Sequence, residues 1–173
     1  MTAPPDDRTA LTMEHAATEA FQDRMRGNAC FGCGPHNTAG LRIKSRWESG
    51  GDAAVCVFHP EPHMTAGPPQ FLNGGVIATI VDCHSICTAV ADAYRREGRN
   101  IDEGELIWYV TGKLEVSYRK PVPIDQPVTL RAQVTQAAEK KSVVECEVLS
   151  RGTLCATAQL VAVRVSNEWL AGS

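Results

Sequence analysis

The sequence predicts an α+β fold in which a curved antiparallel sheet wraps one long central helix. Residues 76–94 form a largely apolar run that contains no helix breaker and is too long for a single strand. Shorter segments elsewhere alternate apolar and polar residues, which is typical of half-buried strands. The last three of these segments are joined by short turns and predict an antiparallel meander, whose natural packing partner is the long helix.

Two strands are expected before the helix. Residues 41–47 and 53–59 alternate with a period of two, and the polar turn between them predicts a hairpin. A loop rich in Pro and Gly follows over residues 60–69. The helix over 76–94 is apolar around most of its circumference, as a buried helix is, and Gly98 suits the position after its end. Four further strands are expected, over residues 106–118, 127–136, 141–149 and 153–165.

Length and composition fit one globular domain. The chain has 173 residues, of which 43% are hydrophobic and 21% charged, which is enough for one sizeable core. We expect residues 1–28 to form a tail with a short amphipathic helix over residues 13–25. Residues 29–173 would then form the domain itself.

The charge balance argues against a nucleic-acid partner, because the net charge is −3 and no basic patch is dense. We expect neither secretion nor a membrane span. The N-terminus lacks an apolar signal segment, and Asp82 and His84 interrupt the longest apolar run. Seven cysteines without an export signal favour a reducing compartment, so we expect a cytoplasmic protein with free thiols.

Asp82 lies in the middle of the apolar helix. The positions that share its helical face are mostly small or apolar, and removing a carboxylate from water is costly. Buried ionisable groups cluster at functional sites, so Asp82 is the first candidate for a catalytic residue. The alternative is that the helix exposes one stripe to solvent and that Asp82 lies on it.

The helix is preceded by Asn73, Gly74 and Gly75. Asn73 is a good N-cap, and the two glycines leave the first N–H groups of the helix unshielded by side chains. Such a start offers backbone donors and the positive end of the helix dipole to a developing oxyanion. An ordinary Asn-capped helix without a catalytic role is an equally good interpretation.

These residues resemble a known signature. The segment NGGVIATIVD resembles the H-G-G-x-x-x-x-x-x-D signature of hot-dog acyl-CoA thioesterases of the PaaI-like group. The segments CFGCGPHNTAGLRI and VTGKLEVSYRKPVP resemble two further segments of that family, and all three occur in the family's order. The resemblance covers about residues 30–165. It implies a hot-dog fold and hydrolysis of an acyl-CoA thioester.

The resemblance also implies residue roles. Asp82 falls at the family's catalytic acid, Gly74 and Gly75 match its glycines, and Thr111 matches a Thr or Ser that accompanies the acid. The carbonyl oxygen would lie against the Gly75 N–H. Asn73 replaces the family's histidine, and asparagine donates a hydrogen bond but does not titrate near neutral pH. The alternative function is therefore a non-catalytic acyl-CoA-binding protein of the same fold.

The resemblance places each site between two subunits, so we expect a homo-oligomer, either a dimer or a dimer of dimers. Arg119 and Lys120, beside a rigid proline turn, are the best candidates to bind the CoA phosphates, although a solvated strand end is an equally good interpretation. His63 is a candidate for the pocket border, and His84 for the pocket edge or an interface. We expect no cofactor.

Cys30 and Cys33, with His36 nearby, have a spacing that suggests a metal site. Structural zinc needs four ligands, and the candidates to complete the set, Cys56 and His63, are supported by nothing but availability. We therefore expect a small turn with buried thiols and no metal. The cysteines in apolar runs are expected in the core: Cys83, Cys87, Cys146 and Cys155.

Overall fold

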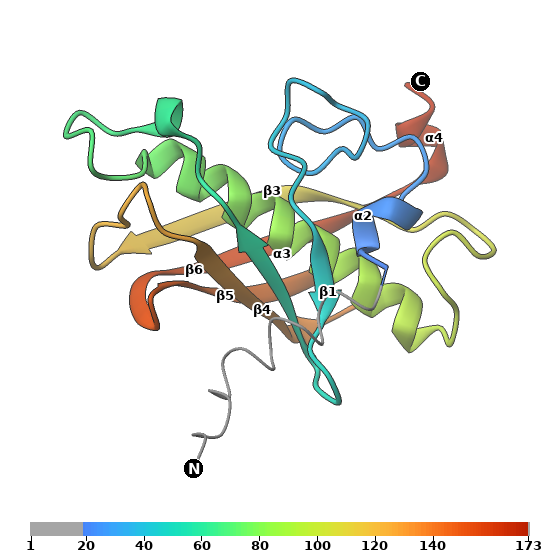
Figure 1. Ribbon diagram of the computed structural model, residues 1–173. Coiled ribbons are helices and arrows are strands. Elements are labelled where there is room, and N and C mark those ends of the chain that lie inside the picture. The colour runs from blue at the N-terminus through green and yellow to red at the C-terminus, as the bar shows by residue number, and fades with distance from the viewer. Residues whose placement is uncertain (1–18, 173) are drawn as a thin grey trace, which may run out of the picture.

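The computed structural model describes residues 19–172 (Figure 1). The elements in chain order are α2 (Phe21–Arg24), β1 (Ser45–Trp47), β2 (Ala53–Phe58), the 3-10 turn η2 (Pro62–Met64), α3 (Gly74–Arg96), β3 (Trp108–Tyr118), β4 (Val128–Ala137), β5 (Lys141–Ser150), β6 (Thr153–Val165) and α4 (Asn167–Leu170). Six strands form one antiparallel sheet in the order β1-β2-β4-β5-β6-β3, and α3 packs against one side of it. The predicted α+β hot-dog architecture is confirmed.

Helix α3 is the centre of the core. It starts two residues earlier than predicted, because the Asn73 side chain caps it and leaves the following glycines helical. It ends at Arg96, and Gly98 adopts a φ of 68°, as expected for a residue that follows a helix. Its length and hydropathy would suffice to cross a membrane, but 61% of its most apolar stretch is buried inside the protein, as in a core helix.

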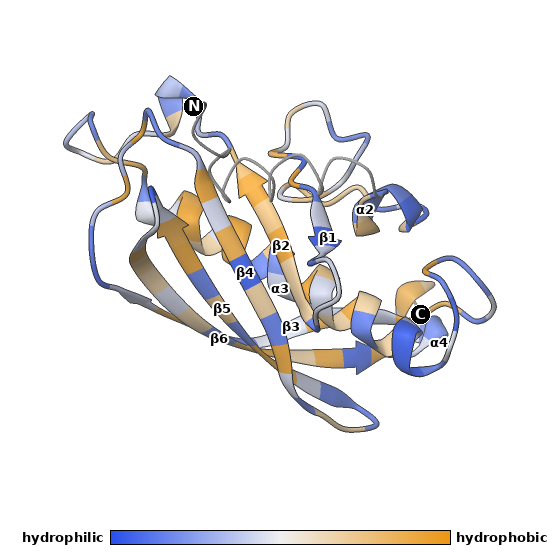
Figure 2. Ribbon diagram, turned by 60° about the horizontal axis from the view of Figure 1, so that its bottom comes forward, coloured by the Kyte–Doolittle hydropathy of each residue, from blue (hydrophilic) through white to orange (hydrophobic). Residues whose placement is uncertain are grey.

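Strands β4, β5 and β6 form the predicted meander. Their buried residues align across the sheet toward α3, as in the row of Cys56, Leu130, Val148 and Ala156. Polar residues alternate with them on the other side, which gives the banded strands in Figure 2. The β5–β6 turn has φ of 50° at Arg151 and 71° at Gly152, the left-handed pair that a two-residue hairpin requires.

The predicted strand over residues 41–47 is wrong in its first half, since β1 begins only at Ser45. Arg42 has a φ of 50°, which breaks the extended conformation. The backbone N–H groups of Leu41 and Ile43 donate instead to Phe31 O and Gly32 O, at 2.8 and 3.1 Å. Residues 41–43 therefore hold the preceding loop in place.

The helix predicted over residues 13–25 lies partly outside the described residues. The described part contains only the single turn α2. Phe21 and Gln22 are buried, so this segment packs on the core.

His84 is fully buried, and its prediction as a pocket-edge or interface group is wrong. Its Nε2 lies 3.2 Å from Ala54 O, which only accepts, so Nε2 carries the proton. Nδ1 then accepts from the Ser45 hydroxyl at 2.8 Å, and Ser45 Oγ accepts from Gln22 Nε2 at 2.8 Å. Burial lowers the pKa of His84 to about 4, so the ring is neutral at pH 7. It is a structural residue that joins α3, β1 and β2.

Candidate functional site

The site is built on Asp82 of α3 and Thr111 of β3. The Thr111 hydroxyl donates to Asp82 Oδ1 at 2.5 Å. Asp82 is half-buried, on the one partly exposed stripe of α3 that also holds Gly75, Thr79 and Ile86. The expectation of a buried carboxylate is therefore only half correct, and the alternative of a helix that exposes one stripe holds for the single chain.

The environment of Asp82 favours a basic carboxylate. Burial has the largest effect and raises the pKa of Asp82. The hydrogen bond from Thr111 lowers this pKa, and the electrostatic interaction with Cys33 raises it. The net direction is upward. A carboxylate of this kind accepts a proton more readily than one in water, which is the property that a general base needs.

A β-bulge at Gly112 turns Thr111 toward Asp82. The register of β3 against β6 shifts between Thr111 and Lys113, so Thr111 and Leu114 both lie opposite buried residues of β6 and face the helix. A side chain at position 112 would meet Val163 Cγ2 at 2.7 Å, which explains the glycine. Without the bulge, strict alternation would place Thr111 and Leu114 on opposite faces.

The start of α3 is organised by Asn73. Its Oδ1 accepts from the N–H of Gly75 at 2.7 Å and more weakly from that of Val76 at 3.4 Å. The Gly75 N–H is therefore hydrogen-bonded within the chain in this conformation, and its expected role toward a carbonyl oxygen stays a prediction. The Gly74 N–H, by contrast, has no acceptor within residues 19–172.

Tyr118 belongs to this site and was missed by sequence reasoning. Its hydroxyl donates to Gly74 O at 2.7 Å, and its ring lies beside Gly74. Partial burial raises the pKa of the Tyr118 phenol, so it stays a donor at neutral pH. The alternation of Leu114, Val116 and Tyr118 already placed it on the helix-facing side of the strand, and this was the available signal.

The candidate CoA-binding residues lie near the helix start. Arg119 and Lys120 follow Tyr118 directly, are exposed, and have their backbone N–H groups fixed on Cys155 O at 2.8 and 3.0 Å. His63 is exposed on η2, 3.5 Å from Glu61. Because Asn73 N donates to Met64 O at 2.9 Å, η2 is tied to the residue that caps α3.

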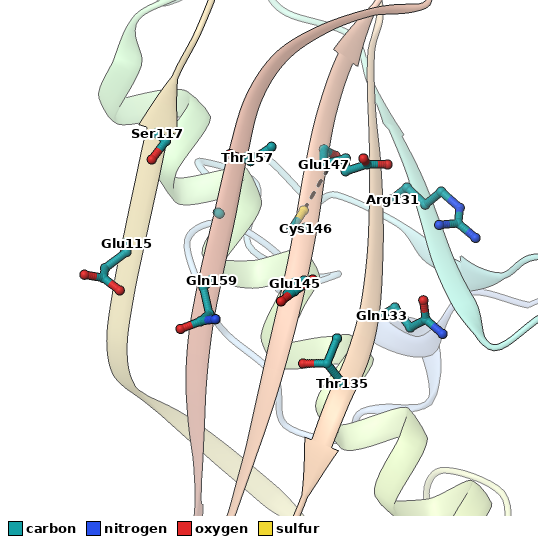
Figure 3. Close-up of a pocket in the computed structure, with 11 residues that line it drawn as sticks. Glu115, Ser117, Arg131, Gln133, Thr135, Glu145, Cys146, Glu147, Thr157 and Gln159 are labelled. Carbon is teal, nitrogen blue, oxygen red and sulfur yellow. Dashed lines mark hydrogen bonds between the residues drawn. The ribbon is translucent and has the colours of Figure 1, made fainter.

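A hollow of about 610 Å³ lies elsewhere (Figure 3). It covers the face of the sheet that is turned away from α3, and its lining includes Glu115, Glu145 and Glu147. Its one cation, Arg131, is paired with Glu48 at 2.7 and 3.0 Å. Its carboxylates disfavour a phosphate-bearing ligand, and neither Asp82 nor Thr111 is part of its lining.

Known proteins share this architecture. The family model of the thioesterase superfamily matches residues 70–157, just over half of the chain. The acyl-coenzyme A thioesterase THEM4 of Xenopus laevis is 30% identical over 96 residues, which cover 56% of this chain and 37% of that protein. The chain thus spans little more than a third of the length of this curated relative.

Two solved structures have a fold similar to that of this chain. A thioesterase superfamily protein from Shewanella loihica is 31% identical, with a TM-score of 0.55 over 72% of this chain and 91% of that one. The PaaI protein of E. coli is 16% identical, with a TM-score of 0.57 over 73% of this chain and 81% of that one, and shows the same fold. The match to the family model, which spans α3 and most of the sheet, shows that the chain belongs to the thioesterase superfamily.

Proposed function

We propose that the protein hydrolyses acyl-CoA thioesters to a free acid and CoA, with Asp82 as the catalytic carboxylate. The observation that supports this most directly is the Thr111–Asp82 hydrogen bond of 2.5 Å, which fixes a half-buried carboxylate on the helix that begins with Gly74 and Gly75. Membership of the thioesterase superfamily supports the reaction class.

Asp82 has one oxygen available for the reaction. Thr111 holds Oδ1, and no residue between 19 and 172 hydrogen-bonds Oδ2. As general base, Oδ2 takes a proton from a water whose oxygen attacks the carbonyl carbon. As nucleophile, it attacks that carbon itself and forms an anhydride, which water then opens. In either route the C–S bond breaks, and CoA leaves as a thiolate that takes up a proton.

The developing oxyanion would be stabilised at the start of α3. The Gly74 N–H has no acceptor in the described chain, and the Gly75 N–H becomes available if the Asn73 side chain turns aside. Each donor aligned with an oxyanion contributes about 3 kcal/mol to the transition state. Tyr118 would hold the backbone of this turn in place through its bond to Gly74 O.

Each site would be shared between two subunits. Asp82 lies seven positions after Gly75, on the same helical face but about 10 Å further along the axis. A single carbonyl group needs partners within about 3 Å, so one chain alone does not supply both. An antiparallel second copy of α3 would place Asp82 of one subunit opposite the helix start of the other.

The surface of the chain supports such a dimer. Among residues 19–172, strand β3 ends the sheet and pairs only with β6, so its outer edge offers unpaired backbone groups to a second copy. Partly exposed apolar side chains lie on α3 and on the helix-facing side of β3: Val76, Ile86, Leu114 and Val116. A second subunit would bury them together with the stripe that holds Asp82.

Arg119 and Lys120 would bind the CoA phosphates, since both are exposed beside the residue that contacts the helix start. We also propose a cytoplasmic location, which is consistent with seven free cysteines.

A non-catalytic acyl-CoA-binding protein is the second candidate. One observation favours it. The Gly75 N–H donates to Asn73 Oδ1 at 2.7 Å and in this state is not free to bind a carbonyl oxygen. The test is to incubate the protein with a panel of acyl-CoAs and to measure the release of free thiol. We expect Asp82→Asn to lose about three decades of rate, as a nucleophile or base does, and to keep its fold.

The matched control is Glu139→Gln, the same chemical change in the exposed β4–β5 turn, which should leave the rate unchanged. Binding of acyl-CoA without thiol release would favour the second candidate. Equal rates in Asp82→Asn and the parent protein would show that Asp82 is not the catalytic group.

A further inference from the structure

Three cysteines that are far apart in the sequence meet beside α3. Cys30 and Cys33 lie in the loop before β1, and Cys83 lies on α3. Their Sγ atoms all lie within 4.8 Å of one another, and Cys30 Sγ is 3.6 Å from Cys83 Sγ. Within residues 19–172 this is the one group of three or more potential metal ligands. Cys83 supplies the third sulfur that neither Cys56 nor His63 provides.

The distance between Cys30 Sγ and Cys83 Sγ is compatible with two sulfurs that share a metal ion, and Cys33 Sγ lies within 4.8 Å of both. With Zn–S bonds of about 2.3 Å, two thiolates of a tetrahedral site lie about 3.8 Å apart. A disulfide would require about 2.05 Å. The 3.6 Å between Cys30 and Cys83 is close to the first value and far from the second.

A buried amide side chain contacts the two loop cysteines. Asn28 is buried and donates from Nδ2 to Cys33 Sγ at 3.4 Å, while its Oδ1 accepts from Cys30 N at 3.1 Å.

The loop is shaped around the sulfurs. A Cβ atom at Gly32 would lie 2.3 Å from Cys83 Sγ, and one at Gly34 would lie 2.6 Å from Cys30 O. The backbone of residues 30–34 therefore approaches α3 as closely as only glycine allows. Leu41 and Ile43, which donate to the loop carbonyls, hold it there.

We propose that Cys30, Cys33 and Cys83 bind one thiophilic divalent ion, Zn²⁺, which links the loop to α3. The three thiolates would occupy three tetrahedral positions, with the fourth on the side of the exposed Cys30 and open to solvent. Binding releases a proton from each ligand that is a thiol beforehand. The metal site does not rest on the proposed hydrolysis, and metal binding needs no substrate, although Cys83 directly follows Asp82 on α3.

The test uses the full-length protein, reduced and free of metal. Titration with Co²⁺ under anaerobic conditions should give one ion per chain, thiolate-to-cobalt charge-transfer bands and the intense d–d bands of a tetrahedral site. Zn²⁺ should displace the cobalt and raise the melting temperature. In native mass spectra, the mass gained on zinc binding should be smaller than the mass of the ion, because the cysteine thiols that bind it lose their protons.

Two ligand variants and one control make the test specific. Cys83→Ser and Cys30→Ser should each weaken Zn²⁺ binding at least about 100-fold. Loss of a residue that only hydrogen-bonds to a ligand weakens metal binding by about 10- to 100-fold, so a larger loss indicates a direct ligand. Cys30 is exposed, so its variant should fold even if Cys83→Ser does not. Cys155→Ser, a buried free cysteine outside the group, should bind like the parent.

Two results would overturn the proposal. One is a cobalt spectrum without thiolate bands. The other is a Cys30→Ser variant that binds zinc as tightly as the parent. Neither result would bear on the release of thiol from acyl-CoA.

Discussion

Removal of the Thr111 hydroxyl is the sharpest perturbation of the proposed active site. Thr111→Val keeps the size and β-branching of the side chain but removes the donor that lies 2.5 Å from Asp82 Oδ1. A hydrogen bond to a charged group contributes about 1.5–3 kcal/mol when buried. Because Asp82 is only half-buried, solvent replaces part of this bond, so we expect the lower end, a loss of roughly 10-fold in kcat/KM.

The pH dependence separates a positioning role from loss of fold. Thr111 lowers the pKa of Asp82 against the effect of burial, so its removal should raise that pKa further. Asp82 acts as the carboxylate, so activity falls as pH drops through its pKa. The acidic limb of the kcat/KM profile should therefore move to higher pH in Thr111→Val and return in Thr111→Ser. An unchanged rate with an unchanged acidic limb in Thr111→Val would refute the role of this hydrogen bond.

Three further predictions follow from the helix start, the core histidine and the sheet edge. Asn73→Ala should lower the free energy of unfolding by about 1 kcal/mol in denaturant titrations, whereas Asn73→Asp, which keeps the accepting oxygen, should not. His84 has a folded pKa of about 4, below its unfolded 6.5, so the unfolded state binds more protons between these values. Stability should be fully present above pH 6.5 and fall by about 3 kcal/mol toward pH 4, and His84→Gln should flatten this slope. Sedimentation at micromolar concentration should show at least a dimer, and a monomer that hydrolyses acyl-CoA would contradict the shared site.

The sequence predicted the architecture well where one physical signal dominated. The apolar run of α3 and the alternation of β4, β5 and β6 each reflect burial against a single core, so their bounds agree with the structure to within about two residues. The early strand was overextended because the left-handed conformation of Arg42 leaves no periodic trace in the sequence. Arginine is not a residue that favours this conformation.

The candidate site was predictable in its parts but not in its contacts. Asp82 and Thr111 were expected to act together, and the 2.5 Å hydrogen bond is consistent with this. The bulge that joins them depends on Gly112, and a glycine within a strand indicates a bulge without giving its register. The hydrogen bond from the Gly75 N–H to Asn73 is the one that an asparagine N-cap makes, but the sequence could not decide between this cap and an open oxyanion site, because both require the same residues. Cys83 joined the loop cysteines only through tertiary packing.

The buried chain of hydrogen bonds from Gln22 through Ser45 to His84 has a practical consequence for shortening the protein. A chain that begins at residue 29 would lack Gln22, which also accepts from Ser45 N at 2.8 Å. The Ser45 N–H would then lose its acceptor inside the core, which costs about 1–3 kcal/mol, and Ser45 Oγ would keep only its hydrogen bond to His84. Phe21 would be lost with it, and a hydrophobic hollow would open beside Trp47. A shortened version of this protein for crystallisation or engineering should therefore start before Ala20, because residues 20–25 cover one side of the core and keep water out of it.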